Sequence, residues 1–194
     1  QNYKTVWGRI FGGQVLSQSL HAAYQTVPEN RIAHSMHAYF ILPGDLNEPV
    51  IYEVDNIRNG GSFTTRRVVA FQKGRAIFNM AASFQKDEEG FDHQIQMPNV
   101  LSPDLLLTDF EQAEKFKEEL AERYQIFLAA HPKVFDFKPV GTNIFLRKEN
   151  ALPINHCWFR LKDKIDMPLQ FHHQLLAFVS CLLYTSDAAD ESRG

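Results

Sequence analysis

The sequence contains only two cysteines, Cys157 and Cys181, among its 194 residues. Two thiols cannot build a disulfide framework or a thiolate metal cluster, so a disulfide-rich secreted domain is excluded and a reducing, intracellular setting is favoured. Neither sign of charge is in large excess, since 20 Lys and Arg against 23 Asp and Glu give a net charge of −3. A general nucleic-acid-binding protein normally carries a basic face, so this composition argues against a nucleic-acid partner.

Long apolar runs are missing as well, and none approaches the ~20 residues of a membrane span. The chain begins at Gln1 without a visible signal peptide or initiating Met, so we expect a cytoplasmic protein whose natural N-terminus precedes Gln1. The 10 Gly and 9 Pro show no period, which excludes a collagen-like chain. Hydrophobic residues make up 44% of the sequence and include 16 Phe, which is enough for a packed core and too much for a disordered chain.

Apolar residues at helical spacing predict a helix over residues 12–27, which begins at two glycines and ends at Pro28. Four strand patterns follow, at residues 31–42, 50–58, 62–72 and 75–85. Asn59-Gly60-Gly61, between the second and third patterns, is a strong hairpin signal. One helix against about four antiparallel strands predicts an α+β fold.

The pattern changes after this segment. Residues 87–153 are predicted to be a linker that contains a helix near residues 109–130, and residues 131–150 stay unassigned. A strand pattern at 154–162 and a helix pattern at 169–180 then restart the strand-and-helix order. We therefore expect residues 154–180 to begin a second α+β unit.

The C-terminal residues have an unusual composition. Residues 181–191 read CLLYTSDAADE and resemble the translation of a transposase adapter used to prepare DNA sequencing libraries. Such scars are excluded from fold reasoning. We expect residues 181–194 to be a non-native tail that follows Ser180; the alternative is a polar helix or disordered tail with an ordinary cysteine.

Five short blocks occur in a fixed order along the chain. They are Ile10–Val15 (IFGGQV), His34–Phe40 (HSMHAYF), Pro43–Asp45 (PGD), Arg58–Phe63 (RNGGSF) and Ser83–Gln85 (SFQ). Together they resemble the acyl-CoA thioesterase II family over residues 1–100, and the similarity returns at residues 156–180.

The resemblance implies a double hot-dog fold, in which two antiparallel sheets each wrap around a central helix. Residues 1–86 would form the first hot-dog unit without its first strand, and residues 154–180 would begin the second. The implied activity is hydrolysis of fatty acyl-CoA to free fatty acid and CoA, with no cofactor and no metal. Acyl-CoA is then the small-molecule partner, and we expect the parent protein to be a homo-oligomer.

The family's catalytic group is an Asp on the helix of the second unit, assisted by a Thr or Ser and a Gln from later strands. Carried over to this sequence, that Asp belongs directly after Ser180, where this chain has Cys181. The assisting residues would lie beyond the segment that resembles the family. The resemblance therefore implies that no catalytic residue is retained and that the fragment is inactive by itself.

Five residues are candidates for substrate binding: Gly12, Gly13, Gln14, His34 and Arg66. Backbone N–H groups at the Gly-Gly-Gln helix start could meet the thioester carbonyl or a phosphate, or the glycines could serve close packing of helix on sheet. His34 could lie at the interface of sheet and helix as a substrate contact or as an ordinary structural histidine. Arg66 could meet CoA phosphates or be solvated like most surface arginines.

The other titratable residues have structural interpretations. Asp45 and Asp55 are read as turn-capping or solvated carboxylates. His34 and His37 are three apart on a strand and should point to opposite faces, while His172 and His173 diverge on a helix and make a zinc site improbable. Cys157 reads as a small buried apolar residue.

Two other functions stay open. One is a non-catalytic acyl-CoA-binding or assembly module. The other is dehydration of a hydroxyacyl thioester, for which a His and an acid are needed near the central helix, and the first helix offers only His21.

Overall fold

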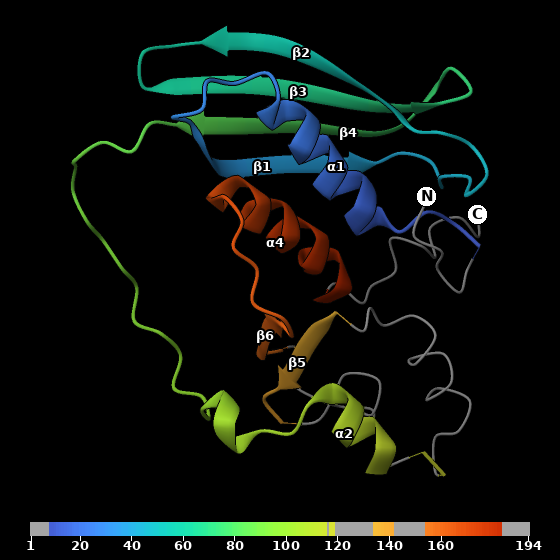
Figure 1. Ribbon diagram of the computed structural model, residues 1–194, viewed down its shortest axis with the longest axis vertical. Coiled ribbons are helices and arrows are strands. Elements are labelled where there is room, and N and C mark those ends of the chain that lie inside the picture. The colour runs from blue at the N-terminus through green and yellow to red at the C-terminus, as the bar shows by residue number, and fades with distance from the viewer. Residues whose placement is uncertain (1–7, 116, 119–133, 142–153, 184–194) are drawn as a thin grey trace. The chain divides into compact units, whose positions relative to one another are not determined.

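The computed structural model describes residues 8–115, 117–118, 134–141 and 154–183. The chain divides into two compact units, shown with the rest of the ribbon in Figure 1. Gln1–Gly90 and Met167–Gly194 form one, called here the sheet unit, and Phe91–Asp166 form the other, the ribbon unit. The domain boundaries predicted from the sequence divide the chain into successive hot-dog units, whereas the division above is into compact parts. The predicted boundaries therefore stay a prediction.

The sheet unit begins with helix α1 (Gly12–Tyr24), which confirms the helix predicted from apolar spacing. The helix ends three residues earlier than predicted because a turn takes over: the Thr26 N–H donates to the Ala23 carbonyl at 3.0 Å and the Val27 N–H to the Tyr24 carbonyl at 3.3 Å. Its apolar stripe is buried, as the pattern indicates, and includes Leu16 and Leu20.

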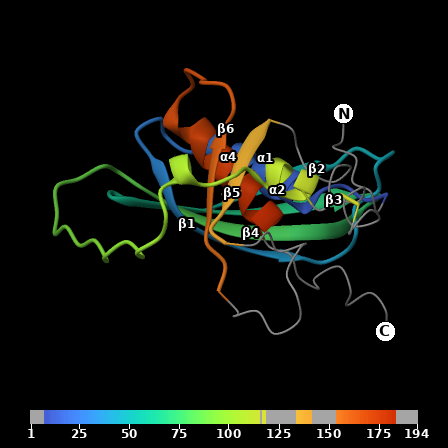
Figure 2. The ribbon, with the colours of Figure 1, turned by 90° about the horizontal axis from the view of Figure 1, so that it is seen from below.

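Four antiparallel strands follow: β1 (Ile32–Phe40), β2 (Ile51–Asn59), β3 (Phe63–Gln72) and β4 (Arg75–Gln85). Their order in the sheet is β1-β4-β3-β2. The four predicted antiparallel strands are thus confirmed: β2, β3 and β4 pair in chain order, while β1 pairs with β4 at the other edge. Figures 1 and 2 show helix α1 on one face of this sheet.

The core lies between α1 and the two central strands. Alternate residues of β3 and β4 point to the helix and are buried, as strand geometry requires; they are Val68, Ala70, Phe78, Met80, Ala82 and Phe84. Burial of a large side chain of this kind contributes about 1.5–3 kcal/mol. The α+β class predicted from the sequence is confirmed.

A β-bulge in β1 overturns the prediction that His34 and His37 point to opposite faces. The register with β4 slips between Ala33 and Ser35, and one extra residue reverses the alternation that follows it. The His34 Nε2 lies 2.8 Å from the Ser83 hydroxyl, and His37 pairs with Ala81. Both histidines are therefore on the face turned away from α1, and His34 is not at the interface of sheet and helix.

The predicted hairpin at Asn59-Gly60-Gly61 joins β2 and β3 and is held by a buried arginine from outside it. Arg31, only 5% exposed, donates to the carbonyls of Gly60 (2.8 Å), Gly61 (2.6 Å) and Ser62. Three carbonyls of one turn thus converge on one guanidinium, whose planar fork of donors suits such an arrangement.

Helix α4 (Leu169–Leu183) belongs to the same unit and lies beside α1 in both ribbon views. It confirms the helix predicted at 169–180 and continues through Cys181. Across the described part of the chain, every helix is too short or too polar to cross a bilayer.

The ribbon unit contains the 3-10 helix η1 (Pro103–Leu105), helix α2 (Asp109–Lys115) and the antiparallel strands β5 (Phe135–Pro139) and β6 (Cys157–Leu161). Strand β6 confirms the pattern at 154–162. The helix predicted at 109–130 is confirmed for its first turns, and most of its remainder lies outside the described residues. Strand β5 falls in the unassigned segment, and its partner is a strand about twenty residues further along the chain.

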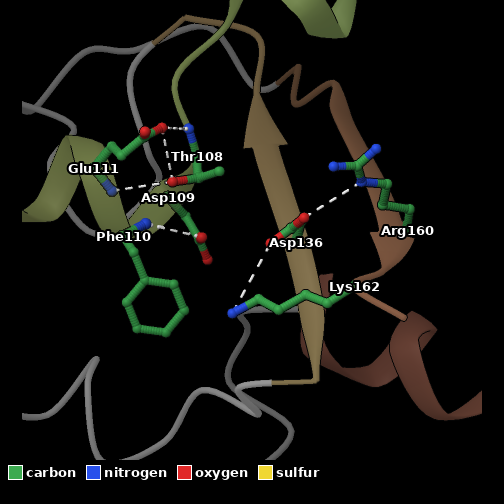
Figure 3. A network of polar contacts seen from close by, with 7 residues as sticks. All are labelled: Thr108, Asp109, Phe110, Glu111, Asp136, Arg160 and Lys162. Carbon is green, nitrogen blue, oxygen red and sulfur yellow. Dashed lines mark hydrogen bonds and ion pairs between the residues drawn. The ribbon is translucent and has the colours of Figure 1, made fainter. Parts of the chain in front are cut away.

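Polar contacts fix the start of α2 (Figure 3). The Thr108 hydroxyl accepts the Glu111 N–H at 3.2 Å, and the Glu111 carboxylate accepts the Thr108 N–H at 2.7 Å. This reciprocal pair is a capping box. Asp136 of β5 lies between Arg160 of β6 (3.3 Å) and Lys162, which directly follows β6 (3.9 Å), so the network is accounted for by local structure.

Candidate active site

The antiparallel seam between α1 and α4 brings the sequence-predicted helix start together with the region around Cys181. At one end Gly13 of α1 packs on Phe178 of α4. At the other end Tyr24 of α1 meets His173 of α4. Since Gly13 and Tyr24 are eleven residues apart on one helix, the two contacts fix both the direction and the register of the pair.

Gly13 is required for the close approach of the two helices. A Cβ atom there would overlap the Phe178 carbonyl oxygen and the Phe11 ring. The Phe11 and Phe178 rings meet edge to face with centroids 4.9 Å apart. A Cβ on Gly12 would lie 2.8 Å from Phe40 on β1. The packing alternative for these glycines therefore has direct support, with Gly13 against a helix and Gly12 against the sheet.

The first turn of α1 also keeps the electrostatic property that suits an anion. Phe11 at the N-cap provides no side-chain hydrogen bond, and the first turn holds no acidic residue. The positive end of the helix dipole is therefore not neutralised by a neighbouring carboxylate of the turn. Gln14 is buried, and its amide donates to Gln18 at 3.3 Å. Substrate binding by Gly12, Gly13 and Gln14 stays a prediction.

Cys181 lies on α4 at the glycine end of the seam. It follows Ala177 by one helical turn, and Ala177 is buried in the core. Cys181 is packed against the same core, and burial raises the pKa of its thiol. The side chain at this position is therefore neutral, whereas a carboxylate here would bring a negative charge to the positive end of α1.

Three backbone or side-chain groups meet at the other end of the seam. The Ala33 N–H donates to the Tyr24 hydroxyl oxygen at 2.9 Å, and that hydroxyl lies 2.8 Å from the His173 Nδ1. The His21 ring nitrogen is 3.2 Å from the Gln174 amide oxygen. At the end opposite the glycines, polar side chains of α1 and α4 thus contact each other, and the Tyr24 side chain also contacts the backbone of β1.

Arg66 lies apart from the seam and is only 1% exposed. Its five N–H groups donate to five acceptors within the sheet unit: the Thr26 hydroxyl and carbonyl, the Arg58 and Thr65 carbonyls, and the Asn59 side chain. Burial lowers the pKa of this guanidinium. Its role as a CoA contact stays a prediction, but the geometry favours a structural role.

The two aspartates singled out from the sequence behave as ordinary surface carboxylates. Asp45 accepts the Asn47 N–H at 2.9 Å in a turn, and this bond, aided by Lys73, lowers the pKa of the carboxyl. Asp55 pairs with Arg67 at 2.9 Å. No group of three or more His, Cys, Asp or Glu suited to a metal ion occurs among the residues with described positions.

Cys157 on β6 is expected to react slowly with alkylating reagents. Burial raises the pKa of its thiol to about 11, so at pH 8 its thiolate fraction is roughly two hundred times lower than that of a thiol with the ordinary pKa near 8.5. Iodoacetamide labelling of the Cys181→Ser variant, followed by mass spectrometry from pH 7 to 10, measures this. A labelling rate at pH 8 equal to that of free cysteine would contradict the buried, protonated thiol.

Sequence reasoning missed the polar end of the seam. In the sequence, Tyr24 is one of the apolar positions of the helix predicted at 12–27, and His173 belongs to a histidine pair for which a zinc site is improbable. A tyrosine at the last turn of one helix and a histidine near the first turn of another are a weak signal for contact, because only the antiparallel packing brings them together. Phe178 was likewise not assigned a role in packing against Gly13.

Residues 3–85 match the model of the acyl-CoA thioesterase N-terminal domain. The chain is 35% identical over 178 residues to acyl-CoA thioesterase 2 of Haemophilus influenzae, which covers 90% of this chain and 62% of the relative. It is 34% identical over 179 residues to human acyl-coenzyme A thioesterase 8, which covers 89% of this chain and 56% of the relative. The chain thus spans about three fifths of the length of these relatives.

Solved structures give the same picture of the fold. An acyl-CoA thioesterase II, TesB2, from Mycobacterium marinum superposes with a TM-score of 0.70 at 34% identity, over 92% of this chain and 61% of that one. A hot-dog protein of Alicyclobacillus acidocaldarius superposes at 0.63 with 18% identity, over 94% and 61% of the two chains. The predicted hot-dog fold is confirmed.

Proposed function

Because this chain belongs to the acyl-CoA thioesterase family, we propose that the protein containing it hydrolyses fatty acyl-CoA to a free fatty acid and CoA at the glycine end of the α1–α4 seam. The supporting observation is the packing of an uncapped helix start, at Gly13, on Phe178, which precedes position 181 by about one turn of α4. The polarised thioester carbonyl needs donors for its developing negative charge, and water needs a base.

In the proposed reaction, helix α4 provides the general base and helix α1 provides the hydrogen-bond donors for the oxyanion. Water attacks the thioester carbonyl carbon, its proton passes to a carboxylate at position 181, and the carbonyl oxygen becomes an oxyanion. First-turn N–H groups of α1 stabilise that oxyanion. The C–S bond then breaks, the carboxylic acid forms, and the CoA sulfur leaves and takes a proton. A positioned general base contributes typically about 10²–10⁴-fold in rate.

Cys181 cannot act as this base. Its thiol is protonated at neutral pH because burial raises its pKa, and a neutral thiol does not accept the proton of water. We therefore propose that the present chain does not turn over acyl-CoA by itself.

The purified 194-residue chain is expected to release CoA from saturated acyl-CoA esters at less than about 1% of the rate of acyl-CoA thioesterase 2 of Haemophilus influenzae, in line with the loss of a general base. Chromatography of free CoA is the appropriate measurement, since the two protein thiols would react with a colorimetric thiol reagent. Turnover close to that of the relative would contradict the proposed role of position 181. If the relative itself failed to release CoA, the proposed family activity would be the part at fault.

A second candidate is a module that binds acyl-CoA without hydrolysing it, because the helix start is present while position 181 is neutral. Calorimetry showing saturable, micromolar binding by a monodisperse chain would favour it, and an absence of binding would exclude it. Dehydration has less support, since His21 contacts Gln174 in place of an acid. Cytoplasmic location and homo-oligomeric assembly stay predictions.

A further inference from the structure

Tyr24 connects three elements at the end of the seam away from the glycines. It is 8% exposed, and its ring meets Phe84 of β4 edge to face with centroids 5.0 Å apart. Its hydroxyl receives the Ala33 N–H from the bulge of β1 at 2.9 Å and contacts the His173 Nδ1 of α4 at 2.8 Å. The position of the hydroxyl is thus set by contacts with the sheet that do not involve α4.

Burial raises the pKa of the Tyr24 phenol, so its hydroxyl carries a proton that needs an acceptor. The hydroxyl oxygen accepts the Ala33 N–H, and among the described contacts the His173 Nδ1 is the acceptor within reach of that proton. The His173 Nδ1 then accepts, and the ring carries its proton on Nε2. This arrangement needs a neutral imidazole, and burial together with the nearby His172 lowers the pKa of His173, which keeps the ring neutral at pH 7.

The contact between Tyr24 and His173 lies near the N-terminal end of helix α4, and position 181 lies near its C-terminal end. His173 and position 181 are eight residues apart on α4, which is about 12 Å along the helix axis. Gly13 and Phe178, between these points, leave no room for the helices to approach further. A slide or rotation of α4 at His173 therefore moves position 181 relative to the first turn of α1.

We propose that His173 is a positioning residue: its hydrogen bond to Tyr24 sets the register of α4 on α1 and holds position 181 beside the first turn of α1. The catalytic meaning of this register rests on the proposed function, but the register itself can be measured without turnover. The polar pair supplies the direction-specific contact that the apolar contacts of the seam lack.

The groups that could disturb this bond are few in the described part of the sheet unit. His21 of α1 contacts Gln174, and His172 is the neighbour of His173 on α4. The residues of β1 on the helix side of the sheet carry no charge; they are Ala33, Met36, Ala38 and Phe40. Loss of the bond at low pH is thus attributable to protonation of His173, with His172 and His21 as the groups to control.

Cys181 reports on the register, because it is packed against the core when α4 is in place. In a Cys157→Ser background, modification by 4,4′-dithiodipyridine measures its exposure, also at acid pH. His173→Leu removes the acceptor at a similar side-chain size, and His173→Asn keeps an acceptor near the Nδ1 position on a smaller side chain. We expect about tenfold faster modification in the Leu variant, the effect of one lost hydrogen bond, and a rate within about twofold of the parent in the Asn variant.

A pH profile separates this role from simple packing. The ratio of the parent rate to the His173→Asn rate cancels the ionisation of the thiol itself. We expect this ratio to rise as the pH falls through the pKa of His173, because only the parent loses its acceptor. The His172→Asn and His21→Asn variants should keep the parent's profile.

Tyr24→Phe removes the same hydrogen bond by deleting the donor and keeps the aromatic ring. Its rate of Cys181 modification is expected to match that of His173→Leu, and it replaces the Leu variant if that variant does not fold. Equal rates in the Leu, Asn and parent proteins, or equal acceleration in Leu and Asn, would overturn the proposal. These outcomes do not depend on CoA release, so failure of the register and failure of the proposed function are distinguishable.

Discussion

Replacing Arg66 by methionine is expected to lower the free energy of unfolding of the sheet unit by about 3 kcal/mol, because five acceptors around a buried guanidinium lose their donor at once. Each unsatisfied buried group costs about 1–3 kcal/mol, and removal of the buried charge offsets part of the sum. For a chain of this size the thermal midpoint should fall by roughly 6–12 °C.

Arg67 is the matched control for this prediction. It is the next residue on the same strand, its side chain is 59% exposed, and its ion pair with Asp55 at 2.9 Å lies on the surface. Arg67→Met should cost less than about 1 kcal/mol, the usual upper value for an exposed pair. Urea unfolding of both variants followed by circular dichroism provides the comparison, and equal losses would show that the Arg66 network does not stabilise the hairpin as its geometry indicates.

Replacing Gly13 by alanine is expected to destabilise the seam by about 2 kcal/mol, although alanine is the better helix former by about 1 kcal/mol. The new Cβ meets the backbone carbonyl of Phe178, which cannot turn aside as a side chain could. The helices must separate, the edge-to-face contact of Phe11 with Phe178 loosens, and position 181 moves with α4. The sign of the effect is therefore opposite to that of helix propensity.

Gly12 and Gly61 provide two controls of different kind. The obstacle at Gly12 is the ring of Phe40, which is 52% exposed and can rotate away, so Gly12→Ala should be nearly neutral. A Cβ on Gly61 meets no atom within 4 Å, so its replacement by alanine should change stability by less than about 0.5 kcal/mol. Thermal unfolding of the three variants ranks them, and a stabilised Gly13→Ala protein would exclude the close-packed seam.

The two variants also bear on the candidate site in different ways. Arg66→Met acts on the hairpin and leaves the seam contacts in place, so acyl-CoA binding by the folded fraction should persist. Gly13→Ala acts on the seam itself and should weaken such binding. Calorimetry on both variants at a temperature where each is folded therefore distinguishes a substrate site at the seam from one at the arginine.

Local patterns were sufficient where the deciding interactions are close in sequence. The apolar stripe of α1 and the Asn-Gly-Gly hairpin each depend on neighbours within one or two turns. The bulge at His34 was not predictable in this way. It depends on which strand lies beside β1, and β4 is more than forty residues away.

The sequence by itself determined the α+β class, the hairpin, the thioesterase resemblance and the identity of the residue at position 181, because these are written in residue type and short-range order. Only the tertiary structure decided that Arg66 is buried with every donor used, that the two histidines of β1 share a face, and that Gly13 packs on Phe178 while Tyr24 holds His173. Such contacts join residues that are far apart in the chain, and their geometry is set by how helices and strands pack, which no local pattern encodes.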